Sequence, residues 1–301
     1  MKLVVLCNAQ LCSERGRSAG PLALIASTLE KIGQPVEIRQ ADPAGLRAAA
    51  DEAVRGGADV VAAIGGDGTL STVAAALVDK PAALGIVPLG TFNHFARDLG
   101  IPLAIEPAVR ILAAGCTRRV DVGEVNGRTF INNASIGAYP RMVLDRRQQQ
   151  IRLGRSKWRA MLHAGWHALR RFPQMEVRLA LADDAPWCST PCVFVGNNTY
   201  RFDLLAPGRR PALDRGRLGL YVLRAPSRLA VLRLGLKAAL GKLAQDGNLI
   251  TVESEEFWID CRRRHVHLGC DGEVFTLLPP LHFRSRPRAL TVVVPPPDGR
   301  D

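Results

Sequence analysis

The chain has 301 residues and a formal net charge of +12, with 40 lysines and arginines against 28 aspartates and glutamates. Hydrophobic residues make up 47% of it, as in a soluble globular protein. No run of eighteen or more apolar residues occurs, which excludes a membrane-spanning helix. The basic surplus favours an anionic partner such as phosphate, nucleic acid or an acidic membrane face. The simpler alternative is a basic surface with no such partner.

The first residues, MKLVVLCNAQ, contain too short an apolar run for a secretory signal and instead predict a first strand. The seven cysteines are odd in number and scattered along the chain. In a chain without an export signal such cysteines are expected to be reduced thiols. The sequence therefore predicts a cytoplasmic protein.

Strand and helix patterns alternate over the first 120 residues. Short buried strands are predicted over 2–7, 36–39, 58–64 and 82–88, and helices over 45–57, 69–78 and 105–115. This alternation indicates a mostly parallel sheet with helices on both faces. Residues 1–120 are therefore expected to form a doubly wound α/β domain.

The pattern changes near residue 120, where Asn126-Gly127 predicts a hairpin turn. Further strands are predicted over 175–181, 192–195, 218–223, 249–252, 256–260, 265–268 and 273–277. Residues 121–285 are thus expected to form an all-β domain. A last strand over 289–297 fits either half, so the tail 286–301 is open to packing back on the first domain.

Two helical patterns interrupt the β-rich half, over 155–172 and 227–243, and both carry basic residues beside an apolar stripe. Such helices either cover a core or rest on an anionic membrane surface. Core cover is the favoured interpretation of both, and surface docking is the alternative.

Four possible zinc ligands, Cys261, His265, His267 and Cys270, occur within ten residues. The surrounding pattern predicts a strand, whose rise is about 3.3 Å per residue. Cys261 and His267 would then lie about 20 Å apart, and Cys270 would point to the opposite face. The spacing therefore argues against a zinc site.

The stretch IGGDGTLS places Gly65-Gly66-Asp67-Gly68-Thr69 between a predicted strand and a predicted helix. Glycines let an anion approach backbone N–H groups closely, and a helix start adds unpaired donors and positive partial charge. An acid in a phosphate loop is expected to hold Mg²⁺ or to accept a proton from a substrate hydroxyl. The alternative is a tight turn with Asp67 as a helix cap.

A second glycine loop, Gly90-Thr91, follows the strand that ends near Pro88. In a parallel sheet both loops emerge at the carboxyl edge and lie close together. Two such loops around one crevice suit a nucleotide polyphosphate.

Four segments together resemble the successive motifs of the diacylglycerol kinase catalytic-domain family, which includes sphingosine kinases and bacterial lipid kinases. They are GGDGT (65–69), PLGTFNHFARDLGIP (88–102), INNASIGA (131–138) and CDGEVF (270–275). NAD kinases also carry the first motif, but the later DGE within a β-rich half favours lipid kinases. The resemblance implies an α/β nucleotide-binding domain and a β-sandwich domain. ATP, Mg²⁺ and the lipid headgroup would meet in the cleft between them.

The resemblance also implies roles for individual residues. Contacts with ATP are expected at Gly65, Gly66, Gly68, Thr69, Leu70, Ser71, Gly90, Thr91 and Asn93. Glu273 is expected to be the proton acceptor, with Asp271 beside it in the catalytic motif, and Asp67 to organise Mg²⁺ and the phosphates. In sphingosine kinase-like members the acid equivalent to Asp67 is the proton acceptor, so this assignment stays open.

The chain departs from the family pattern at several positions. Asn93-His94 replaces the usual Asn-Asp, and Ser71-Thr72 replaces Asn-Glu. The first loop, NAQLCSERG (8–16), is far from the usual Asn-Pro pattern. Asp214 matches an accessory metal ligand of some relatives, but Arg215 stands in place of the second acid and would repel a cation. These changes spare Asp67 and Glu273.

The sequence thus predicts a kinase that depends on ATP and Mg²⁺ and phosphorylates a membrane lipid. The enzyme is expected to dock peripherally on an anionic membrane surface. The alternatives are an NAD kinase-like enzyme and a catalytically silent protein that binds nucleotide or lipid. No nucleic-acid-binding module is recognisable. The identity of the lipid and the oligomeric state do not follow from the sequence.

Overall fold

The structure is a computed structural model that describes residues 1–8, 20–138, 140, 174–180, 186–202, 207–224 and 248–296. The chain forms two compact units. Unit 1 comprises Met1–Val122 and Pro287–Asp301, and unit 2 comprises Gly123–Arg286. The predicted helices over 155–172 and 227–243 lie outside the described residues.

Unit 1 is built on a parallel sheet. Its strands follow the order β2 (Val36–Ala41), β1 (Leu3–Asn8), β3 (Val60–Gly65) and β4 (Ala83–Pro88). The C-terminal part of β18 (Leu281–Val293) continues this sheet by pairing in parallel with β4. The strands β1, β3 and β4 are buried along almost their whole length, as expected for a sheet with both faces covered.

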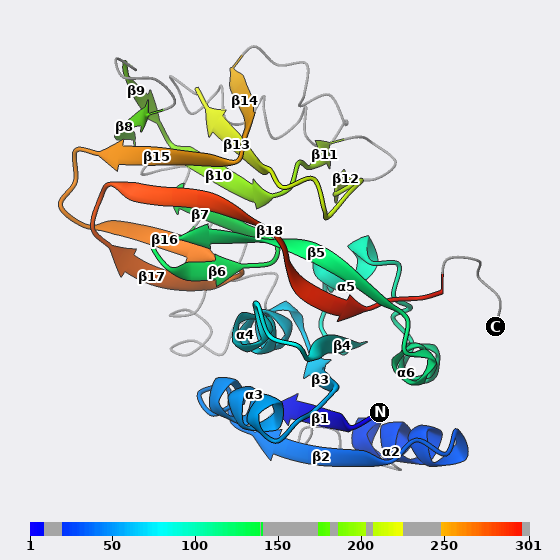
Figure 1. Cartoon of the computed structure of the whole chain (residues 1–301). Coiled ribbons are helices and arrows are strands. Elements are labelled where there is room, and N and C mark those ends of the chain that lie inside the picture. Colours follow the sequence, from blue (N-terminus) through cyan, green and yellow to red (C-terminus); the bar gives the residue numbers. More distant parts are fainter. Residues whose placement is uncertain are drawn as a thin grey trace. The chain divides into compact units, whose positions relative to one another are not determined.

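Helices pack on both faces of this sheet (Figure 1). On one face α2 (Pro21–Lys31) contacts α6 (Ile105–Ala114), and on the other α3 (Leu46–Arg55) contacts α4 (Asp67–Leu77). The α/β prediction for the N-terminal half is therefore confirmed. The sequence pattern did not indicate α2, although Pro21 stands at its first turn, nor did it indicate the short helix α5 (His94–Asp98).

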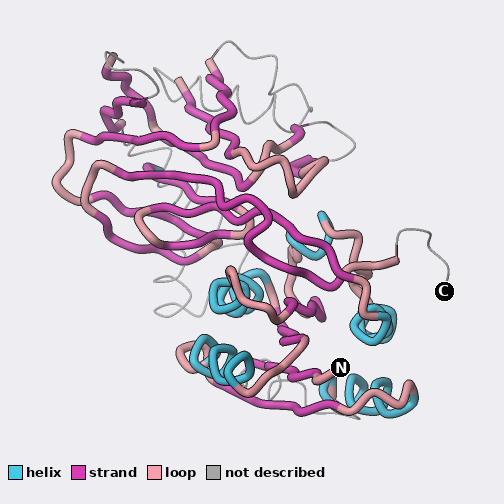
Figure 2. The backbone as a smooth tube through the Cα atoms, viewed as in Figure 1, coloured by secondary structure: helices cyan, strands magenta, loops and turns pink. Residues whose placement is uncertain are grey.

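Unit 2 is rich in strands, and Figure 2 draws most of its described residues in magenta. One antiparallel sheet has the order β14-β13-β10-β7-β16-β17. A second layer contains β18, β15, β8 and β9 in that order, and β5 pairs with β18 and β6 with β5. The bounds are β5 Thr117–Val125, β6 Arg128–Phe130, β7 Asn133–Gly137, β8 Met175–Ala180, β9 Trp187–Thr190, β10 Cys192–Asn197, β11 Arg201–Phe202, β12 Pro207–Arg209, β13 Leu218–Leu223, β14 Leu249–Ser254, β15 Glu256–Cys261, β16 Val266–Cys270 and β17 Glu273–Leu277.

The two sheets of unit 2 bury one hydrophobic core between them. Val193, Leu220 and Leu268 contribute to this core from one sheet, and Phe257 and Phe283 from the other. The two phenylalanine rings stack with centroids 5.3 Å apart. Such a double layer of alternating inward-facing residues is a β-sandwich, so the all-β prediction is confirmed.

Local chemistry explains several details. Asn126 and Gly127 both have positive φ, 45° and 78°, as the predicted two-residue hairpin turn between β5 and β6 requires. Cys7 is disulfide-bonded, so the expectation of reduced thiols is wrong for this residue. The cysteines at 116, 188, 192, 261 and 270 are free. Within the described part of the chain, no helix is long and apolar enough to cross a membrane.

Candidate functional site

The first glycine loop joins β3 to α4 in unit 1. Gly65 ends β3, Gly66 caps the helix with an extended backbone, and Asp67 is already the first helical residue. A Cβ added at Gly65 would lie 2.6 Å from Oγ1 of Thr69, so only glycine fits there. The helix therefore starts two residues earlier than predicted, which puts the acid of the motif at its positive end.

The second glycine loop packs directly against the first. A Cβ added at Gly90 would lie only 2.6 Å from Cα of Gly66, closer than real side-chain atoms approach. The backbone N–H of Leu89 also donates to the carbonyl of Gly65, at 2.9 Å. The structure thus brings the two predicted loops together at the carboxyl edge of β3 and β4, where doubly wound sheets bind ligands.

Asn93 locks the second loop into a closed turn. Its side-chain Oδ1 accepts a hydrogen bond from the Gly90 N–H, and its Nδ2 donates to the Gly90 carbonyl, both at 2.9 Å. Asn93 is 3% exposed and has a φ of 52°, a conformation that asparagine tolerates well. Its amide is thus committed to shaping the loop, whereas Thr91 and Phe92 are exposed.

Asp67 is the one acid of the first loop, and one oxygen of its carboxylate has no donor. Oδ1 is buried, yet no described residue hydrogen-bonds to it. A buried polar atom left without a partner is costly in a folded protein, so a bound ligand, ion or water at this position would be stabilising. The position therefore fits a group that supplies a positive charge, such as a hydrated divalent cation.

The remaining predicted ATP contacts differ in what they offer. Gly68 is exposed and has open space around its Cα, so a ligand can approach its backbone there. Thr69 is 8% exposed, and Leu70 is fully buried in the core. Leu70 can therefore present only backbone atoms to a ligand, while Ser71, one residue further along the helix, is half-buried.

The DGE motif of unit 2 is a hairpin turn followed by the start of a strand. Asp271 and Gly272 have φ values of 46° and 86° and connect β16 to β17, where Cys270 pairs with Glu273. Glu273 is the first residue of β17 and is exposed. Asp271 and Glu273 thus stand two residues apart on one rigid turn, with only the latter side chain open to solvent.

The carboxylate of Asp271 is fully engaged by backbone. Its Oδ2 accepts from the N–H of Ile131 at 2.8 Å, and its Oδ1 from those of Asn132 and Asn133 at 2.9 and 3.0 Å. The Asp271 N–H returns a hydrogen bond to the Asn133 carbonyl, at 2.9 Å. The third and fourth sequence motifs are therefore tied together, and this acid holds the turn that presents Glu273.

A buried arginine, which the sequence analysis missed, completes this polar cluster. Arg210 is 4% exposed, and its Nη1 donates to the carbonyls of Ile131 and Asn197, at 2.6 and 3.1 Å. Its Nη2 donates to Oδ1 of Asn132 at 3.0 Å. These partners lie 13 to 79 positions away in the chain, so no local pattern identifies Arg210.

No metal centre is evident from side chains alone. Within the described ranges, no group of three or more histidine, cysteine, aspartate or glutamate side chains could hold a metal ion. Asp214, the matched accessory position, is exposed and is followed by Arg215, whose backbone N–H donates to Asn198.

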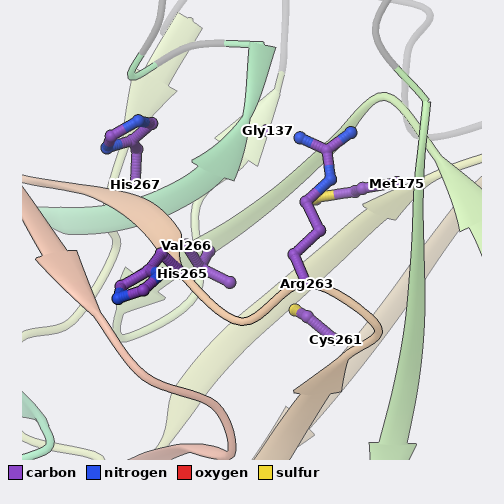
Figure 3. A pocket seen from close by; sticks show the side chains of 7 residues that line it. All are labelled: Gly137, Met175, Cys261, Arg263, His265, Val266 and His267. Atoms are coloured by element: carbon purple, nitrogen blue, oxygen red, sulfur yellow. The ribbon is translucent and has the colours of Figure 1, made fainter.

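The cysteine–histidine segment forms a pocket rather than a ligand set (Figure 3). Cys261, His265 and His267 line it, but Cys270 lies at the far end of β16, paired with Glu273. Burial raises the pKa of the Cys261 thiol to about 11, which keeps this thiol protonated at neutral pH. A thiol held in that form is a poor zinc ligand.

Comparisons with known proteins agree with this geometry. The model of the diacylglycerol kinase catalytic domain matches residues 2–125, and that of the YegS C-terminal NAD kinase beta sandwich-like domain matches residues 141–294. A diacylglycerol kinase of Bacillus subtilis is 29% identical over 91% of this chain and 90% of its own length. A protein of Citrobacter koseri named "Probable lipid kinase YegS-like" is 43% identical over 32% of this chain and 33% of its own length.

A crystal structure of a diacylglycerol kinase from Bacillus anthracis has the same fold, with a TM-score of 0.70, 19% identity and coverage of 98% of this chain and 97% of that one. The matched family model and these relatives show a kinase of the ATP-dependent lipid kinase class. The chain belongs to the family of diacylglycerol kinases and YegS-like lipid kinases. The expectation from its four motifs is thereby confirmed.

Proposed function

We propose that this protein transfers the γ-phosphate of ATP to the hydroxyl of a diacylglycerol-like membrane lipid. Unit 1 would bind the nucleotide and unit 2 would bind the lipid and supply the base. The observation that carries the proposal is the pair of abutting glycine loops, beside which a buried oxygen of Asp67 has no described donor. Such a place combines backbone donors for phosphate with a ligand for the cation that accompanies it.

The glycine loops are the proposed triphosphate site. Gly68 has open space around its backbone, and the start of α4 adds positive partial charge. Asp67 would hold Mg²⁺ directly or through water. Bound there, the ion would neutralise charge that develops on the transferred phosphoryl group.

Glu273 is the proposed general base. Its exposed carboxylate would accept the proton of the lipid hydroxyl as that oxygen attacks the γ-phosphorus, and the bond to ADP breaks. Asp271 was expected to share the catalytic role. Three backbone donors occupy its oxygens, and we therefore propose it as a positioning residue that fixes the turn bearing Glu273.

Contact with an anionic membrane surface remains part of the proposal. The net charge of +12 favours it, because the negative potential of anionic lipids attracts basic proteins. A dinucleotide hydroxyl is the second candidate acceptor, since the C-terminal half matches a domain described as NAD kinase-like.

The test is incubation of the protein with Mg-ATP labelled at the γ-phosphate and a total lipid extract, with NAD as a parallel acceptor. We expect a labelled lipid that disappears in Asp67→Asn. A matched control, Asp42→Asn, removes an exposed acid of unit 1 and should label the lipid normally. Label on NAD alone would replace the lipid acceptor by a dinucleotide, and no label on either acceptor would overturn the proposal.

A further inference from the structure

The pocket shown in Figure 3 lies in unit 2 at the opposite end of β16 from the DGE turn. Val266 begins β16 at the pocket, and Cys270 ends it beside Asp271. Four residue steps of about 3.3 Å place these ends about 13 Å apart. The pocket is therefore distinct from the position at which Glu273 would meet a reacting hydroxyl.

Cationic and imidazole side chains line the rim of this pocket, and apolar atoms form its floor. Arg263, His265 and His267 are the polar side chains, and no carboxylate is among the lining residues. Met175, Val266 and Cys261 are all less than 9% exposed and complete the floor. The Cys261 thiol stays neutral, as described above, so it adds no negative charge.

The charge of this rim is not neutralised within the part of the chain that the structure describes. Elsewhere in unit 2 arginines pair with acids, as Arg178 does with Asp260 at 3.1 Å and Arg262 with Glu176 at 3.0 Å. Arg263 and Arg264, by contrast, have no ion-pair partner among the described residues, and neither has His265.

Hydrogen bonds hold two of the rim groups in place. Nη2 of Arg263 donates to the carbonyl of Gln174 at 3.0 Å, which leaves its other guanidinium N–H groups for a ligand. Nδ1 of His267 lies 3.2 Å from Oγ1 of Thr276. In Figure 3 the side chain of Arg263 lies on one side of Val266, and both imidazoles lie on the other.

We propose that the pocket formed by Arg263, His265 and His267 binds the phosphate group of a phosphate ester, separately from the kinase site. Arginine donors arranged in a planar fork match phosphate oxygens, and an apolar floor accommodates the carbon atoms of the ester. The volume of about 90 Å³ is small and suits a phosphate group. The ester is either a phospholipid headgroup or a free phosphate compound, which share this chemistry.

Trp187 lies beside the same end of the sandwich. The guanidinium carbon of Arg262 stands 5.0 Å from the centre of its ring, and that of Arg178 stands 5.3 Å away. Trp187 is 36% exposed. Tryptophan next to arginine is typical of surfaces that meet the headgroup region of a bilayer, and this favours the phospholipid as the source.

The test uses histidine side-chain NMR, because each relevant site carries its own reporter. The chain has six histidines, of which His94 lies beside the nucleotide loops and His282 on another part of unit 2. Titration with inorganic phosphate or glycerol 3-phosphate should shift the signals of His265 and His267 saturably and leave His282 unchanged. Shifts of His94 alone would assign the phosphate to the glycine loops and overturn the proposal.

Two double variants give the matched control. Arg263→Gln/Arg264→Gln should weaken phosphate binding about tenfold or more, because charge-assisted hydrogen bonds are lost. Arg47→Gln/Arg55→Gln removes the same charge from the exposed side of α3 and should leave binding unchanged. An equal loss in both variants would show a general charge effect and overturn the proposed site.

Vesicles distinguish the two sources. If the ligand is a phospholipid, Arg263→Gln/Arg264→Gln should co-sediment less with phosphatidylcholine vesicles that contain phosphatidylglycerol. Its co-sedimentation with vesicles of phosphatidylcholine alone should not change. If the variant co-sediments normally but no longer shows the histidine shifts with phosphate, the ligand of the pocket is a free phosphate compound. If neither measurement responds to the pocket variant, the proposal fails. Phosphorylation of a detergent-dispersed lipid should be unaffected by Arg263→Gln/Arg264→Gln, so failure of the kinase proposal would be seen separately.

Discussion

Two aspartates of the same chain, one in each unit, are used in opposite ways. Asp67 in unit 1 has a buried oxygen that no described residue hydrogen-bonds, whereas both oxygens of Asp271 in unit 2 accept backbone N–H groups. Both belong to short Asp-Gly motifs, and both are expected from the sequence to take part in catalysis. The difference separates an acid with a buried oxygen open to a ligand from one whose hydrogen bonds hold a turn.

The largest expected effect tests which acid does the chemistry. Glu273→Gln should lower turnover by a factor of about 10²–10⁴, because a general base contributes that much to rate. Binding of ATP, measured by calorimetry, should stay near normal. The control Glu255→Gln alters an acid that is 73% exposed in the same unit and should leave turnover unchanged. Normal turnover in Glu273→Gln would transfer the role of base to Asp67.

The second effect contrasts the two aspartates by stability. Asp271→Asn should lower the free energy of unfolding of unit 2 by about 2 kcal/mol, since charged hydrogen bonds to buried amides are lost. Asp67→Asn should change stability by less than about 1 kcal/mol, the usual contribution of an acid at a helix start. All four tryptophans, at positions 158, 166, 187 and 258, fall in unit 2.

Tryptophan fluorescence during urea denaturation therefore reports on unit 2, and circular dichroism follows the whole chain. If Asp271→Asn unfolds with the wild-type midpoint, the three backbone hydrogen bonds do not hold the turn, and the contrast between the aspartates disappears.

The smallest effect concerns the close approach of the glycine loops. Gly90→Ala places a Cβ 2.6 Å from Cα of Gly66 and should force the loops apart, at a cost of about 1–3 kcal/mol. We expect the KM for ATP to rise about tenfold, since 1.4 kcal/mol corresponds to a factor of ten. Gly45→Ala is the matched control, because Gly45 precedes α3 outside the glycine loops and its added Cβ would make only ordinary contacts, the nearest at 3.7 Å. Equal KM values for the two variants would show that the loop contact does not shape the nucleotide site.

Much of this architecture follows from local patterns. The buried strands β1, β3 and β4 and the glycine loops after β3 and β4 are visible as apolar runs that end at glycine. Helix α2 was missed because its first residue is proline, which also marks loops. The Asn126-Gly127 hairpin was predicted because both residues suit positive φ.

The polar cluster of unit 2 could not be predicted in the same way. Arg210 contacts Ile131 across 79 positions of sequence, and Asp271 reaches the same residue across 140. Such partners are set by sandwich topology, in which β7 lies between β10 and β16. Only the pairing of these strands brings the polar groups of residues 131–133 within hydrogen-bonding distance of Asp271 and Arg210.

Strand β18 has a consequence for how the protein is made. Its last residues belong to unit 1, where Leu290, Val292 and Val293 are completely buried and Val292 pairs with Leu84 of β4. The N-terminal unit therefore lacks part of its core until residues 287–293 have left the ribosome. A fragment ending at Val122 would expose the edge of β4. A version of unit 1 that folds by itself therefore needs residues 287–293 joined to it by a linker.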